Sequence, residues 1–149
     1  WAPSLGAAAA SLFRVLKEDG SLDILMVGKD DGRNFKKSIV AAQRKHLSFK
    51  QIMASAVLIQ RVNAQQCKKA FSVFEPEYHL EVEEEYKVVY GAFDDHMKWW
   101  KARSTQIISE IKDKEGFLID LQDALESTRE PQGIPFDAAF IKIHVRAKG

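Results

Sequence analysis

The stretch YHLEVEEEYKVVY, residues 78–90, decides the fold class because its side chains alternate between apolar and charged. In an extended chain, one face then carries Leu80, Val82, Tyr86, Val88 and Tyr90, with only Glu84 out of place. The other face carries His79, Glu81, Glu83, Glu85 and Lys87. A period of two is typical of a strand that packs one face on a core and leaves the other in water.

The stretch AAFIKIHVRAK, residues 138–148, has the same alternation with the opposite charge. Its apolar side chains are Ile141, Ile143 and Val145, and its polar ones are Lys142, His144, Arg146 and Lys148. Opposite charges at facing positions on neighbouring strands stabilise a sheet. We therefore expect the strands near 78–90 and 139–148 to be neighbours.

The N-terminal part predicts a hairpin. Two apolar runs, SLFRVLK at 11–17 and SLDILMVG at 21–28, flank the turn EDGS, and Asp-Gly between apolar runs is typical of a hairpin. The run 21–28 is mostly apolar on both faces. A strand of that kind is expected inside the sheet or beneath a helix.

Helical spacing begins at Asn34, which we expect to cap a helix that ends near His46. Ser48 opens a second predicted helix with the capping pattern S-x-x-Q. We expect this helix to reach about Lys69 and, since its ASAVLI segment is apolar nearly all round, to be the buried central helix.

A third predicted helix begins at Asp94 and Asp95, acidic residues that favour a helix N-terminus. Its apolar stripe consists of Met97, Trp100, Ser104, Ile107, Ile108 and Ile111. Residues 117–127 fit either a helix or a strand, and we favour a helix. The sequence thus predicts a single α+β domain over 1–149, with an antiparallel sheet packed against three or four helices.

Charge is unevenly distributed along the chain. Residues 1–74 carry a net charge of +7 and residues 75–149 a net charge of −6, which leaves +1 overall. The basic excess is concentrated at Lys29, Arg33, Lys36, Lys37, Arg44, Lys45 and Lys50. These side chains are either solvated helix faces or a patch for phosphates, acidic lipid headgroups or an acidic protein. The charge difference also allows the two ends of neighbouring copies to attract each other.

Trp99 lies about 100° from Trp100 on a helical wheel, on the polar side with Arg103. One interpretation is that its ring stacks on Arg103 within the chain. The other is that Trp99 and Arg103 belong to an interface, where exposed tryptophan is enriched.

Signals for catalysis are weak. His79, Glu81 and Glu83 form a weak metal candidate, since their side chains share one face of a strand. The same carboxylates facing Lys and Arg would stay ionised, whereas general acid catalysis needs a raised pKa. The sequence contains no nucleotide-binding, zinc-protease, thiol-redox or serine-hydrolase motif. We expect no cofactor, no catalytic residue and no enzyme.

The lone Cys67 cannot form an internal disulfide, so it is expected to be a small apolar residue of a protein compatible with a reducing compartment. The longest apolar run, at 56–62, is interrupted by Gln60 and Arg61. It is too short for a membrane helix, so we expect a soluble or peripheral protein.

These observations favour a non-catalytic structural or interaction protein, of the same kind as viral matrix proteins and accessory subunits of large complexes. We expect it to self-associate or dock in a larger assembly, and to offer its basic region to nucleic acid, nucleoprotein or an acidic membrane surface. The alternative is a nucleic-acid-binding module. That function requires aromatic side chains among the basic ones, and only Phe35 and Phe49 qualify, both of which we expect in the core. A small enzyme of another kind is the third hypothesis.

Overall fold

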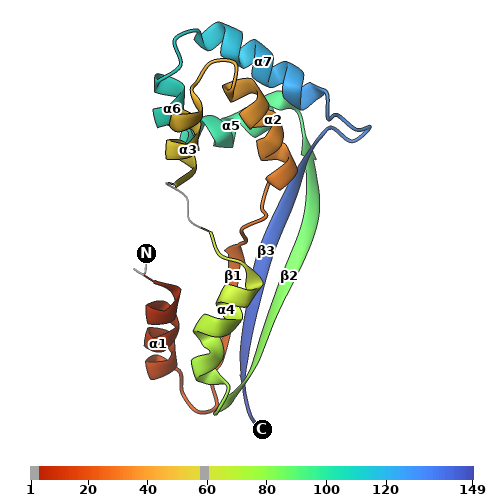
Figure 1. Ribbon diagram of the computed structural model, residues 1–149. Helices are drawn as coiled ribbons and strands as arrows, with labels where there is room; N and C mark the ends of the chain where they lie inside the picture. The colour runs from red at the N-terminus through yellow and green to blue at the C-terminus, as the bar shows by residue number, and fades with distance from the viewer. Residues whose placement is uncertain (1–3, 58–60) are drawn as a thin grey trace. The chain divides into compact units, whose positions relative to one another are not determined.

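A computed structural model describes residues 4–57 and 61–149 (Figure 1). The described chain has an α+β fold, as predicted, with a three-stranded antiparallel sheet. Its strands are β1 (Ser21–Val27), β2 (Tyr78–Gly91) and β3 (Ile134–Ala147). Its helices are α1 (Leu5–Val15), α2 (Arg33–Gln43), α3 (Phe49–Val57), α4 (Ala64–Phe71), α5 (Phe93–Arg103), α6 (Thr105–Ser109) and α7 (Lys114–Glu126). A 3₁₀ turn, η1 (Ser72–Phe74), follows α4.

The strand order is β1-β3-β2, so the predicted pairing of the 78–90 and 139–148 strands is confirmed. β1 pairs with β3 in an antiparallel register that runs from Ser21 opposite Arg146 to Val27 opposite Phe140. β1 therefore lies at an edge of the described sheet and not inside it. The other expected position, beneath a helix, agrees with the packing of Leu22, Ile24 and Met26 on the cluster that contains Cys67 and Phe71 of α4.

The prediction of a first hairpin strand at 11–17 is wrong, because residues 11–15 belong to α1. Ser4 caps this helix by accepting a hydrogen bond from the Ala7 N–H at 3.1 Å. The alanines of 7–10 have high helix propensity and carry the helix into the apolar run that follows. The run was too short for its spacing alone to distinguish a helix from a strand.

The predicted helix from Ser48 to about Lys69 is two helices, α3 and α4, and residues 58–60 lie outside the described part. Its S-x-x-Q start is confirmed: the Gln51 N–H donates to Ser48 Oγ, and the Ser48 N–H donates to Gln51 Oε1. Asn63 and Gln66 form a second capping box that begins α4. The third predicted helix is likewise divided, into α5 and α6, so the described chain has seven α-helices rather than three or four.

Residues 117–127 are helical up to Glu126, as favoured from the sequence. The Asp113 carboxylate accepts a hydrogen bond from the Gly116 N–H at 2.9 Å and begins α7. Phe117, Leu121 and Leu125 are buried along one side of this helix, while Ile119 is 62% exposed. Helical spacing, not alternation, therefore accounts for the apolar residues of this segment.

The chain divides into two compact units. The first unit consists of Trp1–Asp31, Arg61–Tyr86 and Ala139–Gly149, and the second of Gly32–Gln60 and Lys87–Ala138. β2 and β3 each contribute residues to both units. The single domain remains a prediction, and the units are described separately below.

In the first unit, α1 packs against α4, and the core lies between these helices and the apolar face of the sheet (Figure 1). Ile143 and Val145 of β3 are completely buried there. Phe74 is also completely buried and contacts the rings of Phe13 and Tyr78 edge-on. Since apolar burial is the main stabilising contribution to folding, this cluster gives the first unit a core of its own.

In the second unit, α7 packs along α2, as Figure 1 shows. The core includes Phe35 and Ile39 of α2, Leu121 and Leu125 of α7, and Trp100 of α5. His96 is buried among them, and its Nε2 is 2.8 Å from the carbonyl oxygen of Ile134. A hydrogen bond satisfies this buried ring, so His96 is a structural residue of the core.

Candidate functional site

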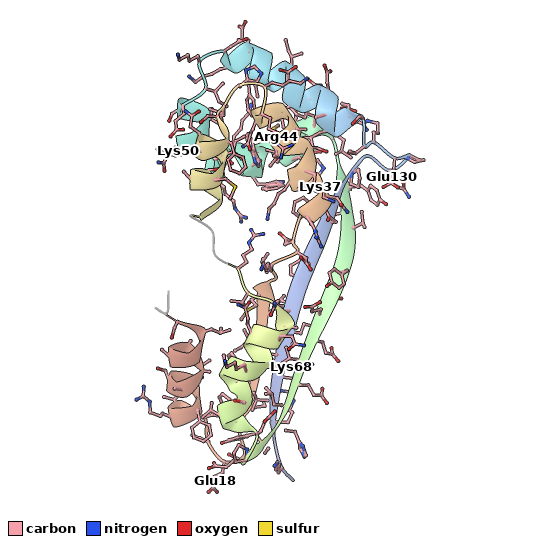
Figure 2. The ribbon with its side chains drawn as sticks, viewed as in Figure 1. Glu18, Lys37, Arg44, Lys50, Lys68 and Glu130 are labelled. Atoms are coloured by element: carbon pink, nitrogen blue, oxygen red, sulfur yellow. The ribbon has the colours of Figure 1, made fainter. Side chains whose placement is uncertain are left out.

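The basic region forms its densest cluster on α2. Arg33, Lys36 and Lys37 lie in α2, and Arg44 is its C-cap residue. All four are exposed, and we call their side chains the basic helix face. On a helical wheel with 100° per residue, these four side chains span an arc of about 100°. The centre of this arc lies about 120° around the helix axis from the centre of the arc of buried residues. Figure 2 labels Lys37 and Arg44 on this helix. Helical spacing thus gathers four cations that the sequence separates by eleven positions.

The N-terminus of α2 is fixed by β3 and not by the predicted Asn34 cap. The Asp137 carboxylate accepts hydrogen bonds from the N–H groups of Asn34 at 2.9 Å and Phe35 at 3.2 Å. The N-cap residue is Gly32, at φ 65°, where a side chain would collide with the Phe136 ring. Only glycine adopts this backbone without strain, so Gly32 and Asp137 together position the basic helix face.

Lys45 lies close to an acidic residue of α7. Its Nζ is 3.6 Å from Asp120 Oδ1 of α7, and the half-buried His46 ring is 2.6 Å from the other carboxylate oxygen. The hydrogen bond to His46, together with Lys45, holds the pKa of Asp120 below its ordinary value. Lys45 is therefore engaged within its own unit.

Lys50 lies in α3 beside two exposed apolar side chains. Phe49 is 72% exposed and Met53 is 47% exposed, four residues apart on one side of the helix. The prediction that Phe35 is a core residue is confirmed, but the same prediction for Phe49 is wrong. Phe49 directly follows the capping residue Ser48, where the helix leaves its side chain in solvent.

The seventh predicted residue, Lys29, is exposed in the first unit, whereas the other six lie in the second. Within the second unit, residues 32–60 contain six Lys or Arg and no Asp or Glu. The acidic segment 87–138 folds onto them, which leaves that unit with 13 basic and 10 acidic residues. The difference between the halves of the chain thus largely cancels in the folded unit, while α2 keeps a locally positive face.

Trp99 is half-buried and not free on a polar surface. Its ring lies 5.5 Å from the Phe35 ring and 5.2 Å from Phe136, between centroids. The exposed Arg103 guanidinium lies 6.0 Å from the Trp99 ring centroid, within the range of a cation–π contact. The structure therefore contains the stacking that was one of the two interpretations. The interface role of Trp99 and Arg103 stays a prediction, now for the part of the ring that the core leaves exposed.

The weak metal candidate consists of three exposed side chains on β2, His79, Glu81 and Glu83. Across residues 4–57 and 61–149, no group of three His, Cys, Asp or Glu side chains is arranged to hold a metal ion. The neighbouring Glu85 instead binds Lys142 of β3 at 2.8 Å, and the pKa of Lys142 is raised by Glu85 and, less strongly, by Glu83. Glu85 on this face thus forms an ordinary cross-strand ion pair.

A second charge cluster, which sequence reasoning missed, joins β3 to β1. Asp23 Oδ1 is 2.5 Å from His144 Nδ1 and 2.7 Å from Arg146 Nη2. These hydrogen bonds, that of His144 first, hold the pKa of Asp23 below its ordinary value of 3.8. Asp23 was the only charge within its predicted strand, which is the signal that could have revealed the cluster.

Cys67 is fully buried in the first unit, with its Sγ 3.8 Å from Met26 Sδ. Burial, and then the nearby Glu84, raise the pKa of this thiol. A thiol is reactive as the thiolate, so Cys67 is an apolar core residue, as expected.

Compared with known proteins, the chain matches no family model and no curated sequence. Among the residues that the structure describes, no helix is long and apolar enough to cross a membrane.

Proposed function

We propose that this protein is a non-catalytic interaction protein, which binds a partner with closely spaced anionic groups through the basic helix face and takes part in a larger assembly. One observation carries the proposal: α2 and its C-cap residue hold four exposed cations on one side, within a segment that contains no acidic residue. Lys and Arg so arranged attract phosphate groups, and each contact with phosphate releases counterions.

The surroundings of α2 support the same proposal. Asp120 neutralises Lys45 but lies on the α7 side of the helix, whereas no hydrogen bond or ion pair of the Lys37 or Arg44 side chain occurs among the described residues. Exposed Phe49 and Met53 add apolar area beside Lys50. Basic and apolar side chains together are typical of surfaces that bind acidic membranes.

The test is binding of the whole chain to vesicles that contain phosphatidylserine, measured by sedimentation at low and high salt. Each basic residue near an acidic membrane contributes about 1 kcal/mol, so Lys37→Gln with Arg44→Gln should weaken binding roughly 30-fold. Lys68→Gln with Lys69→Gln is the matched control, since both lysines are exposed on α4 of the first unit. Absence of binding by the wild type at low salt, or an equal loss in the control, would refute the proposal.

A nucleic-acid-binding module is the second candidate, and the exposure of Phe49 favours it. Stacking of a base on an aromatic ring is worth about 1–3 kcal/mol. Single-stranded RNA that binds more tightly than vesicles, and loses affinity at least fivefold with Phe49→Ala, would select this function.

A further inference from the structure

β1 combines the sequence of an interior strand with the position of an edge strand. Its residues are apolar on both faces except for Ser21 and Asp23. Yet β3 is its one neighbour in the sheet, and no backbone hydrogen bond joins residues 21–27 to any other described segment. Natural sheets protect exposed edges with charges, proline or bulges. β1 has one acidic residue, and that residue is engaged by β3.

The register shows which backbone groups point away from β3. Val27 lies opposite Phe140, so Gly28 lies opposite Ala139, and the Gly28 N–H donates to the Ala139 carbonyl at 2.9 Å. In an antiparallel pair, hydrogen-bonded and non-hydrogen-bonded positions alternate. The backbone N–H and C=O groups of Leu22, Ile24 and Met26 therefore point towards β3 and bond to it. The outward N–H and C=O groups are those of Ser21, Asp23, Leu25 and Val27.

Burial indicates that the same edge is incompletely covered. Ile143 of β3 is completely buried, whereas its register partner Ile24 is half-buried. Leu22 and Met26 are also half-buried although they share the core-facing side. On the other face, Leu25 is 64% exposed and Val27 is 39% exposed. Exposed apolar side chains, beside backbone groups that have no partner among residues 4–57 and 61–149, are what a further strand would cover.

We infer that β1 pairs with β1 of a second copy of this chain, antiparallel and about a two-fold axis at Ile24, so that two sheets become one of six strands. This inference rests on the proposed role in an assembly and names the surface that the assembly uses. In this register Asp23 lies opposite Leu25 of the second copy, and Ser21 opposite its Val27. All four outward-facing residues then form backbone hydrogen bonds, and every residue of β1 has a partner.

The side chains favour this partner over a different one. On the core-facing side, Ile24 lies opposite Ile24 of the second copy, and Leu22 lies opposite Met26 of the second copy. Both are apolar pairs. On the other face, each Asp23 lies beside a leucine and remains bound to His144 and Arg146 of its own chain. No like charges face each other. A strand that complements itself in this way forms the closed interface of a two-fold dimer.

The other edge of the sheet does not fit this role. β2 presents exposed Glu81, Glu83 and Glu85, and two copies paired along β2 would bring their carboxylates together. Like charges directly opposite each other destabilise strand pairing. Pairing through β1 is therefore the arrangement that charge allows.

The first experiment measures the molar mass of the whole chain by light scattering over a range of concentrations. The wild type should rise from the 16.9 kDa of one chain towards twice that value. Leu25→Pro removes an outward N–H without breaking a bond to β3, and proline is tolerated at such edge positions. This variant should remain monomeric with an unchanged circular dichroism spectrum.

Two alanine variants separate strand pairing from general hydrophobic attraction. Leu25→Ala keeps the N–H and should weaken association less than Leu25→Pro. Ile119→Ala removes an apolar side chain of similar exposure, 62% against 64%, from α7 of the second unit and should leave the molar mass unchanged. A wild type that stays monomeric at every concentration overturns the inference, as does equal weakening by the Leu25→Ala and Ile119→Ala variants.

Disulfide cross-linking tests the register. If Leu25→Pro fails to fold, cross-linking also tests whether β1 pairs with β1 of a second copy. Ile24→Cys places two thiols at the two-fold axis, in a non-hydrogen-bonded pair whose Cα separation of about 4.5 Å permits a disulfide. Leu22→Cys, opposite the partner's Met26, should not cross-link. The native Cys67 is buried, so the wild type should give no cross-linked dimer. Equal cross-linking of both cysteine variants, or of neither, overturns the β1 register.

These outcomes are distinguishable from failure of the proposed function. Vesicle binding depends on α2 of the second unit and requires none of the β1 substitutions. A monomeric wild type that still binds vesicles through Lys37 and Arg44 would remove the β1 interface and leave the anionic partner in place.

Discussion

β1 and β2 flank the same strand, yet the two edges are built differently. β2 carries a row of exposed carboxylates, and Glu85 binds Lys142 of β3. β1 carries one carboxylate, which binds both His144 and Arg146, and otherwise exposes Leu25 and Val27. Charge protects one edge from pairing with another chain, and the other edge lacks that protection. The sheet therefore has one edge protected by charge and one edge, along β1, without that protection in the described chain.

The largest expected effect contrasts the middle strand with the open edge. Ile143→Ala should destabilise the chain by about 2–5 kcal/mol, because Ile143 is completely buried and its removal leaves a cavity. Ile24→Ala, at the facing position, should cost clearly less, since its side chain is only half-buried. Urea unfolding at a concentration too low for association measures both. Equal losses would mean that β1 is covered as fully as β3.

The second prediction concerns how β2 is held at its start. Tyr78 is buried, and its hydroxyl donates to the Lys17 carbonyl at 3.0 Å. Tyr78→Phe leaves that carbonyl without this donor and should cost about 0.5–1.5 kcal/mol in urea unfolding. Tyr86, which is 62% exposed, serves as the control, and Tyr86→Phe should leave stability nearly unchanged. A larger effect at Tyr86 would contradict the finding that β2 is anchored at its start and exposed further along.

The third prediction uses pH to weaken the contact between β1 and β3. His144 and Arg146 lower the pKa of Asp23 in the folded chain below its ordinary value of 3.8. A lowered folded pKa means that this contact stabilises the chain above the ordinary value and is lost as pH falls through the folded pKa. Asp23→Asn should therefore reduce the loss of stability in acid, measured by urea unfolding near neutral pH and near pH 3. Asp19→Asn, in the exposed turn before β1 and outside this contact, is the control variant.

The smallest expected effect concerns the contact between β2 and β3. Glu85→Gln and Lys142→Met should each destabilise slightly, and their effects should not be additive, because the two side chains form an ion pair. High salt should abolish the coupling. By contrast, Glu83→Lys and Arg146→Glu should be additive, because Arg146 binds Asp23 of β1. Coupling between Glu83 and Arg146 would instead place the Arg146 side chain towards β2.

Alternation made the two long strands predictable. Along β3, Ile141, Ile143 and Val145 are buried while the basic residues between them remain accessible, as the period of two requires. The capping box at Ser48 could also be found from four residues. Both patterns are local in sequence. The alternation repeats every two residues, and the capping box spans four.

The predictions that failed all concern features that depend on contacts between distant parts of the chain. Residues 11–17 have too few apolar positions to separate the two periods, and the helix was decided by the alanines before them and by packing against α4. The cap of α2 comes from Asp137, which is 103 positions away from Asn34 in the chain. A helical wheel places Trp99 on the polar side of its helix, but Phe35 of α2 and Phe136 of β3 cover part of its ring. A wheel shows one helix and none of its neighbours.

By itself, the sequence determined the α+β class, the pairing of the two long strands and the accumulation of cations on α2, because periodicity and charge act over short ranges of chain. Only the tertiary structure decided which cations acquire acidic neighbours, as Lys45 does from Asp120, and which strand lies at the edge. The apolar side chains on both faces of β1 indicate that both faces can be buried. Which segment covers them depends on contacts between residues far apart in the chain, and the strand order β1-β3-β2 leaves one edge of β1 unpaired within the described chain.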